Sequence, residues 1–229
     1  MKLNSDIIAF TVCIEYSDIF KNVIDSWIKM EFKKVIVVTS NKDYKTISIC
    51  KEYGFEVISI DYLRPFKWGV YRNIAINNIN NDWILGMDCD TYLDFIRKID
   101  VNTLKDNCLY GLYHGMISID QLISLKFGFK PKIGFWFKKC MGPFQLFNLE
   151  YINKNNIRYL EHSTIVNGKG VDWHFSRNFQ NILLFDEKIY CINLGERDGR
   201  ISKPIISKLY PKLITRYNNI NGFTKSVIK

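Results

Sequence analysis

Two aspartates separated by one residue, Asp88 and Asp90, stand directly after the apolar run WILGM. A run of this length is typical of a buried strand, so both carboxylates would lie at its carboxyl end. Carboxylate oxygens bind hard divalent cations such as Mg²⁺ and Mn²⁺. The pair therefore indicates a metal site, although such acidic pairs also occur as helix caps and solvated turns.

A third candidate carboxylate is Asp172, in the segment GVDWHFSRNF. Its spacing is typical of a helix, and the neighbouring Trp173 and Phe175 could partly desolvate the carboxylate and favour its protonation. Asp172 is therefore a candidate general base. Aspartate is also a preferred N-cap, so a structural role at the helix start stays open.

Other polar residues could complete the metal site. His174 could supply a nitrogen ligand, whereas a histidine between aromatic residues could also simply pack or lie on the surface. Asn193 or Glu196, in the segment NLGE, could instead supply an oxygen to a hard cation. His114 and His162 have no partner pattern and are interpreted as structural.

The elements that must position these residues alternate between strands and helices. Apolar runs predict strands over residues 6–13, 33–40, 55–60 and 83–87, and apolar residues at helical spacing predict helices over 18–31, 43–53 and 69–80. Asp43 stands at an N-cap position, and the third helix is expected to turn Val70, Ile74 and Ile79 inward. This alternation predicts an α/β fold with a Rossmann-like, mainly parallel sheet flanked by helices, whose ligands gather at the carboxyl ends of the strands.

The pattern is looser after residue 95. The aromatic segments LYGLYHGMISI and FGFKPKIGFWFKK resemble hairpins, and KIYCINL, at 188–194, predicts a further strand. We expect this second half to be built on the same sheet. The segment 201–229 places lysines among Ile, Leu and Tyr, which predicts a basic peripheral tail, helical with disorder toward its end.

The composition indicates a single ordered domain. The 229 residues, 47% of them hydrophobic, are enough for one α/β core. The first residues show no signal-peptide pattern, and no window approaches the roughly 18 uncharged apolar residues of a membrane-spanning helix. Six cysteines without CxxC spacing indicate free thiols in a reducing compartment, so we expect a cytoplasmic protein with at most peripheral membrane contact.

The net charge of +9 favours an anionic partner, whether nucleic acid, an acidic membrane face or a phosphorylated substrate. The same excess of lysine would also follow from a composition rich in Ile, Asn and Lys, which an AT-rich genome produces without selection for binding. The charge alone therefore identifies no partner.

The segment FKWGVYRNIAINNINNDWILGMDCDTYL resembles the signature of GT-A glycosyltransferases, and in particular the family-2-like, DxD-containing enzymes of bacteria and phages. In that signature a helix rich in small residues and carrying Arg-Asn precedes a Trp-Ile-Leu strand and the acidic motif. The matching residues are Gly69, Arg72, Asn73, Asn77, Asp82, Trp83, Ile84, Leu85, Asp88 and Asp90.

Three further segments are similar to the same family, in the same order. VIVVTSNKDYKTISICKEYGFEV resembles the second strand and helix, where Thr39 and Asp43 would lie near the nucleotide base. GVDWHFSRNF is similar to the helix-start motif whose aspartate, here Asp172, commonly acts as base. MGPFQLFNLEY looks like the segment that lines the acceptor side, here with Gly142, Phe144, Gln145 and Phe147.

The resemblance implies a metal-dependent, inverting glycosyltransferase that moves a sugar from a nucleotide donor, with UDP favoured, to a hydroxyl acceptor. Its Mn²⁺ or Mg²⁺ would offset the charge on the departing nucleoside diphosphate. The expected metal ligands are Asp88, Asp90, His174 and Asn193, and the expected base is Asp172. The residues expected at the nucleotide are Thr11, Thr39, Asp43, Arg72 and Asp88.

The family also implies a division of the chain. Residues 1–95 would form the half that binds the nucleotide sugar, 96–200 the acceptor half and 201–229 the tail. Arg72 is expected to clamp the diphosphate, because guanidinium groups fit phosphate oxygens.

The sequence is compatible with several acceptors and with two other classes of protein. Hydroxymethylated pyrimidines in DNA and surface glycan or glycolipid precursors both suit a basic enzyme, and a protein acceptor is open as well. A nucleotidyltransferase would share the parallel sheet and the metal, but the Gly-rich, Arg-Lys start typical of that class is absent, since CIEYSDIF follows the first strand. A non-catalytic nucleic-acid-binding module would need none of the three aspartates.

Overall fold

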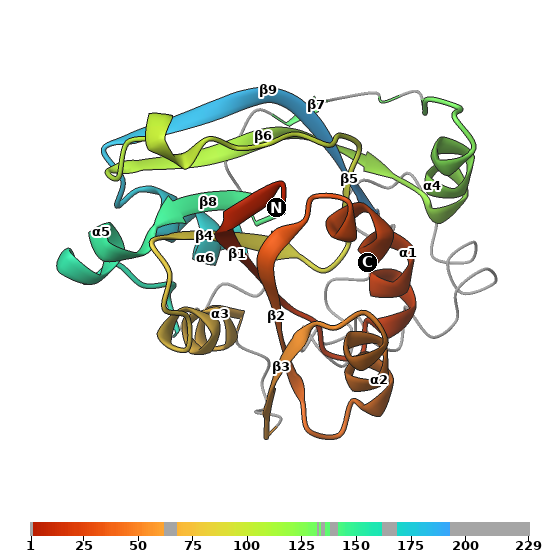
Figure 1. Ribbon diagram of the computed structural model, residues 1–229, viewed down its shortest axis with the longest axis horizontal. Coiled ribbons are helices and arrows are strands. Elements are labelled where there is room, and N and C mark those ends of the chain that lie inside the picture. The colour runs from red at the N-terminus through yellow and green to blue at the C-terminus, as the bar shows by residue number, and fades with distance from the viewer. Residues whose placement is uncertain are drawn as a thin grey trace, which may run out of the picture.

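The computed structural model describes residues 2–61, 68–131, 133, 136–137, 142–161 and 169–192. The first half contains β1 (Asn4–Val12), α1 (Ser17–Ile28), β2 (Phe32–Ser40), α2 (Tyr44–Glu52), β3 (Glu56–Ile60), α3 (Trp68–Asn77) and β4 (Trp83–Asp88). The second half contains β5 (Thr91–Leu93), a 3₁₀ turn (Val101–Thr103), β6 (Cys108–Ile117), α4 (Ile119–Lys126), β7 (Trp136–Phe137), β8 (Gln145–Asn148), α5 (Leu149–Lys154), α6 (Lys169–Ser176) and β9 (Asn181–Ile192). Figure 1 shows their arrangement around one sheet.

The strands of the first half are parallel, in the order β3-β2-β1-β4. Successive side chains of a strand point to opposite faces. Ile7 and Ala9 of β1 therefore enter the core shared with α1 and α2, while Ile8 and Phe10 enter the core shared with α3. Burial on both faces explains why these strands are continuous apolar runs. The predicted α/β fold, a sheet flanked by helices, is confirmed.

The second half extends the same sheet. β8 is antiparallel to β4, β6 is antiparallel to β8, and β9 runs parallel to β6. β5 follows β4 in sequence but pairs with β9 at the far end of the strand order β3-β2-β1-β4-β8-β6-β9-β5, and β7 pairs with β6. The sheet therefore curls until β5 reaches α1, where Trp27 Nε1 donates a hydrogen bond to the Thr91 carbonyl (2.7 Å) and the Leu93 N–H donates one to Ser26 Oγ (3.1 Å).

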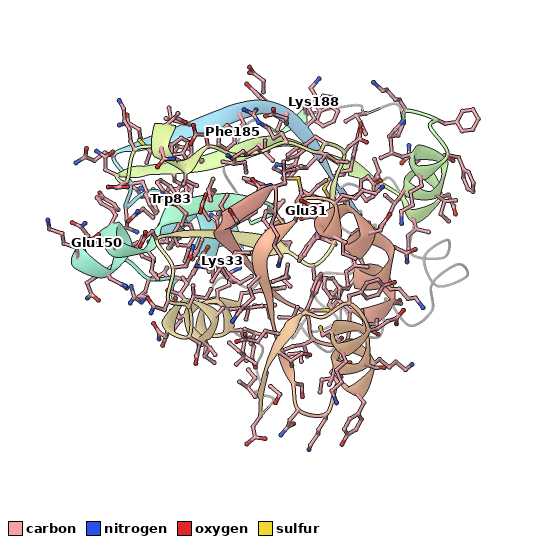
Figure 2. All side chains as sticks on the ribbon, in the orientation of Figure 1. Glu31, Lys33, Trp83, Glu150, Phe185 and Lys188 are labelled. Carbon is pink, nitrogen blue, oxygen red and sulfur yellow. The ribbon has the colours of Figure 1, made fainter. Side chains whose placement is uncertain are left out.

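Aromatic rings connect the two halves on one face of the sheet. Trp83 of β4 lies edge-on to Tyr110 of β6, with ring centroids 6.2 Å apart, and Tyr110 stacks on Phe185 of β9 at 5.5 Å. Figure 2 labels Trp83 and Phe185 on their strands. The core beneath the parallel strands thus continues under the second half.

The structure corrects the predicted course of α3. The helix ends at Asn77 rather than at residue 80, and its buried face carries Tyr71, Arg72 and Asn73. Ile79 is buried as expected, Ile74 packs partly buried against the same core, and Val70 is only partly buried. Polar residues share the buried face because they have partners inside the protein: Asn73 exchanges two hydrogen bonds with the backbone of Tyr159, at 2.9 and 3.0 Å.

Two elements of the second half also differ from expectation. β9 begins at Asn181, seven residues before the predicted start, and pairs with β6 along most of its length. The two aromatic segments do pair, because β7 runs antiparallel to β6, but the connection between them contains the unpredicted helix α4. Its start is a capping box in which Ser118 and Gln121 each accept a hydrogen bond from the other's backbone N–H.

The described cysteines are free thiols, as expected. Burial raises the pKa of Cys50 to about 12, and the neighbouring Cys13 and Asp43 act in the same direction. The Cys50 thiol therefore stays protonated at neutral pH. The cysteines in question are Cys13, Cys50, Cys89, Cys108 and Cys191, all buried.

Candidate active site

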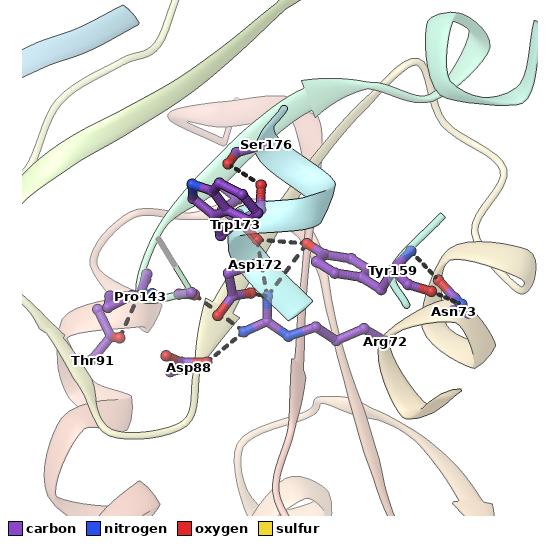
Figure 3. A network of polar contacts seen from close by, with 11 residues as sticks. Arg72, Asn73, Asp88, Thr91, Pro143, Tyr159, Asp172, Trp173 and Ser176 are labelled. Carbon is purple, nitrogen blue, oxygen red and sulfur yellow. Dashed lines mark hydrogen bonds and ion pairs between the residues drawn. The ribbon is translucent and has the colours of Figure 1, made fainter. Parts of the chain in front are cut away.

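The candidate active site is organised around Arg72, a buried cation on α3 that is 3% exposed. Its Nη2 donates a hydrogen bond to Asp88 Oδ1 at 2.5 Å, and its Nη1 donates one to Asp172 Oδ1 at 2.8 Å. Figure 3 shows the guanidinium between the two carboxylates, one at the end of β4 and the other in the first turn of α6. Arg72 thus joins two of the aspartates singled out in the sequence.

Charge balance keeps this cation in place. Burial alone would lower the pKa of the Arg72 guanidinium, but Asp172, Tyr159 and Asp88 together raise it above its ordinary value. The side chain therefore stays protonated. The Asp88 and Asp172 side chains keep 30% and 17% of their surface exposed, so both carboxylates are accessible from solvent.

The close approach of the two carboxylates depends on Gly142. A Cβ at this position would lie 2.6 Å from Asp88 Oδ2, 2.8 Å from Asp172 Oδ2 and 3.1 Å from Arg72 Nη2. The second oxygens of both carboxylates therefore face the same backbone position. Arg72 Nη2 also donates a hydrogen bond to the Gly142 carbonyl, at 3.3 Å. Any larger residue would push the carboxylates apart.

Two buried polar side chains also accept hydrogen bonds from the guanidinium. Arg72 Nη1 also donates to Gln145 Oε1 of β8 (2.9 Å) and to the Tyr159 hydroxyl (3.3 Å), and that hydroxyl donates to the same Gln145 oxygen at 2.6 Å. The Tyr159 ring stacks on Phe175 of α6, with centroids 4.0 Å apart. α3, β8 and α6 are thereby fixed relative to one another, and the carboxylates with them.

The two aspartates expected to hold a divalent cation lie on the partly exposed side of this cluster. Arg72 binds Asp88 through Oδ1, the Asp88 side chain stays 30% exposed, and the Asp90 side chain two residues on is half-buried. Over the described ranges, no group of three or more His, Cys, Asp or Glu side chains surrounds a common point. A cation held by Asp88 and Asp90 would therefore take its remaining oxygens from a ligand such as a diphosphate, or from residues beyond the described ranges.

Among the described residues, His174 belongs to no such group. The residue is exposed on α6, and its ring lies edge-on to Trp173, with centroids 5.4 Å apart. Asn193 falls outside the described residues, as do Glu196 and His162. The histidine that does lie near the acidic motif is His114 of β6: burial lowers its pKa to about 4, against the opposing effect of the Asp88 charge.

Two of the residues expected at the nucleotide, Thr39 and Asp43, form a separate cluster. Asp43 is the N-cap of α2, where it accepts hydrogen bonds from Thr46 N (3.2 Å), from Thr46 Oγ1 (2.8 Å) and from Glu15 N (2.6 Å). Thr39 Oγ1 lies 3.5 Å from the same carboxylate. Thr11 is buried near the end of β1, and its hydroxyl has no partner among the described residues. These three residues do not touch the Arg72 cluster in any contact described for them.

Sequence reasoning missed two members of the site. Tyr159 lies between patterned segments and carries no motif, so only its hydrogen bonds to Arg72 and Gln145 identify it. Gly142 had been placed on the acceptor side by its segment, but nothing in the sequence indicated its contact with both carboxylates. A glycine in an aromatic-rich segment was the one available signal.

Comparison with known proteins identifies the fold. No family model and no curated protein sequence matches the chain. Among solved structures, it resembles residues 1–349 of S. aureus TarS in complex with UDP, with a TM-score of 0.60 and 13% identity over 96% of this chain and 73% of that one. It also resembles the mannosyltransferase PcManGT from Pyrobaculum calidifontis in complex with GDP-Man and Mn²⁺, with a TM-score of 0.54 and 9% identity over 93% of this chain and 69% of that one. The chain therefore has a GT-A-like glycosyltransferase fold.

Proposed function

We propose that this protein transfers a sugar from a nucleotide donor to a hydroxyl acceptor, with inversion at the anomeric carbon and with the help of a divalent cation. The observation that carries the proposal is the meeting of Asp88 and Asp172 at Gly142, at the carboxyl end of a sheet strand. Such strand ends are where α/β folds bind ligands. The likeness to structures that hold UDP or GDP-Man supports the choice of donor.

Each carboxylate has a distinct role in this proposal. Asp172 accepts the proton of the acceptor hydroxyl as that oxygen attacks the anomeric carbon. Asp88 and Asp90 would hold the cation, which supplies positive charge for the departing diphosphate. Arg72 is too deeply buried to reach a ligand with its whole guanidinium, so we assign it a positioning role: it holds Asp172 in place beside Asp88.

The acceptor would lie over Trp173, the residue after the proposed base. Its indole is 50% exposed, and the guanidinium of Arg177 stacks on the ring 4.3 Å from its centroid. An exposed, immobilised aromatic face suits stacking against the ring of an acceptor sugar or base. Trp173→Ala is expected to raise the acceptor KM with little change in donor hydrolysis, and an unchanged acceptor KM would remove Trp173 from the site.

The decisive experiment measures nucleoside diphosphate release from UDP- and GDP-sugars, with Mn²⁺, Mg²⁺ or EDTA. We expect one donor to turn over in the presence of metal, and Asp172→Asn to lower turnover by about 10²- to 10⁴-fold. Asp90→Ala should raise the metal concentration needed for half-maximal turnover. Asp186→Asn, which changes an exposed carboxylate on β9, is the matched control and should behave as wild type.

The product distinguishes the alternatives. Release of pyrophosphate instead of nucleoside diphosphate would indicate nucleotidyl transfer. Retention of the donor's anomeric configuration, read by NMR of the product, would contradict the role of Asp172 as base. No turnover of any donor, together with binding that is unaffected by Asp88→Asn and Asp172→Asn, would leave a non-catalytic binding protein.

A further inference from the structure

An apolar patch at the end of α4 lies open to solvent. Phe127 is 78% exposed, Phe129 71% and Ile123 46%, and the three lie within seven residues of one another. The inward face of the same helix carries Leu122 and Leu125, which are buried in the core. The helix therefore already packs through one face and presents a second apolar surface outward, and such a surface usually marks an interaction site.

The local backbone holds the two phenylalanines outward. After α4 the chain turns at Gly128, whose φ of +89° is a conformation that side-chain-bearing residues rarely adopt. The Phe129 N–H donates to the Ser124 carbonyl (3.0 Å), and the Gly128 N–H donates to the Leu125 carbonyl (2.9 Å). These are the two hydrogen bonds of a Schellman motif, so the exposed rings are fixed before any partner arrives.

The charge around the patch is positive in sequence. From the start of α4, residues 119–149 contain five lysines and one acidic residue, Asp120; the lysines are Lys126, Lys130, Lys132, Lys138 and Lys139. Lys126 and Lys130, which flank the phenylalanines, are exposed. Lys126 also pairs with Asp25 at 3.0 Å, and Lys130 lies near Asp94, but exposed pairs of this kind contribute little and can be exchanged for other anions.

Aromatic and aliphatic side chains flanked by lysines are the composition of segments that lie in the interface of an anionic bilayer. The rings enter the boundary between headgroups and acyl chains while the ammonium groups meet lipid phosphates. A single-stranded nucleic acid fits less well, because Ile123 offers no stacking face and no arginine accompanies the rings. Among the described residues, no helix is both long and apolar enough to cross a membrane.

We propose that the end of α4, formed by Ile123, Lys126, Phe127, Phe129 and Lys130, docks this protein on an anionic lipid surface. The patch shares no residue with the Arg72 cluster, so the proposal stands independently of the reaction assigned to that cluster. It also differs from docking through the basic segment 201–229, because it depends on the two phenylalanines.

The test is sedimentation of the full chain with vesicles of phosphatidylcholine alone or with roughly 30% phosphatidylglycerol. We expect the wild type to bind the anionic vesicles, and Phe127→Ala/Phe129→Ala to weaken that binding by about tenfold or more, since each ring buries apolar surface in the interface. The matched control is Ile182→Ala/Leu183→Ala, which removes two apolar side chains of 47% and 42% exposure from β9 and should bind as wild type. Circular dichroism verifies that both double variants are folded.

A second readout reports insertion directly. In Phe127→Trp, tryptophan emission should shift to the blue on addition of anionic vesicles by more than it does in the wild type. Vesicle binding that survives Phe127→Ala/Phe129→Ala would overturn the proposal and assign docking to another basic segment. An absence of vesicle binding would also overturn it, and in that case a change from dimer to monomer in the double variant would identify a second copy as the occupant, whereas lost binding to single-stranded DNA would identify nucleic acid.

Discussion

Two polar clusters stand at carboxyl ends of parallel strands, and they use their carboxylates differently. In the cluster of Asp43, the carboxylate accepts hydrogen bonds from Thr46 and Glu15, and so its oxygens serve the start of α2 and the loop after β1. In the cluster of Arg72, a single buried cation binds one oxygen each of Asp88 and Asp172 and directs their second oxygens toward Gly142. The first cluster is a local cap, while the second is built from three distant parts of the chain.

This difference separates structural from chemical carboxylates. An N-cap carboxylate is stabilised by N–H groups that its own helix would otherwise leave unpaired, so folding consumes its hydrogen-bonding capacity. A carboxylate paired with a buried arginine is likewise stabilised. At Asp88, however, the hydrogen bond from Arg72 uses only one of the two carboxylate oxygens. Asp88 therefore combines a fixed position with an available oxygen, which is the combination that ligand binding requires.

The largest effect is expected from Arg72→Ala. Removing the cation leaves two carboxylates in a partly buried site without compensation, so the free energy of unfolding should fall by roughly 3–5 kcal/mol and turnover should be lost. Urea denaturation followed by circular dichroism measures the free energy of unfolding.

Arg72→Lys should recover part of the stability but little turnover, because one ammonium group cannot replace the two hydrogen-bonding arms of the guanidinium. Lys21→Ala, which removes an exposed cation from α1, is the control. A loss below about 1 kcal/mol for Arg72→Ala would show that the cluster is not a structural hub.

Gly142→Ala should change the positions of the two carboxylates without changing the charge of the site. The added methyl group would collide with Asp88 Oδ2 and Asp172 Oδ2, so the two carboxylates must move while Arg72 stays. A displacement of about 1 Å is expected to lower turnover by about 100-fold, with a smaller effect on stability. Nucleoside diphosphate release measures this, and Pro143→Ala, at the next residue, is the control. Wild-type turnover in Gly142→Ala would mean that the approach of the two carboxylates has no role in the reaction.

The sequence predicted the local cluster better than the distant one. The four parallel strands and the cap of α2 follow from short-range patterns, namely apolar runs and an aspartate before a helix, and each of them is present in the structure. The pairing of Arg72 with Asp172 joins residues 100 positions apart, and no periodicity contains that information. The resemblance to a family brought both residues into the site, but it suggested a diphosphate clamp where the structure has a buried ion pair.

The second half shows the same limit. β9 was placed from the apolar run near Cys191, but its first residues are exposed or half-buried and become a strand only because β6 pairs with them. α4 depends on a capping box whose Ser118 and Gln121 were not recognised in an aromatic-rich segment. Where tertiary pairing decides the element, local propensity gives no reliable signal.

Protonation of His114 should lower the stability of the folded protein at acidic pH. Its pKa in the folded protein is about 4, below the ordinary 6.5, so between these values the unfolded chain binds a proton that the folded chain does not. Stability therefore falls as the pH decreases from about 6.5 toward 4, by about 2 kcal/mol at pH 5 from this group alone. His114→Gln should remove that part of the pH dependence, as measured by urea denaturation at pH 7 and pH 5. His174→Gln changes an exposed histidine and should leave the dependence intact; equal slopes in wild type and His114→Gln would contradict the assignment.

The smallest effect, and the sharpest test of the comparison, is expected from Asp43→Ala. Loss of the N-cap should lower the free energy of unfolding by about 1 kcal/mol, and Asp43→Ser, which keeps a capping oxygen, should recover most of it. If folding uses both carboxylate oxygens, Asp43 makes no contact with the nucleotide. The KM for the donor then stays within about twofold of wild type in Asp43→Ser, because this variant keeps the helix cap. A donor KM raised about tenfold in Asp43→Ser, at wild-type stability, would show instead that Asp43 contacts the nucleotide directly, as the family resemblance implies. The two clusters would then both be parts of one donor site, and the distinction between a capping and a chemical carboxylate would fail at this strand end.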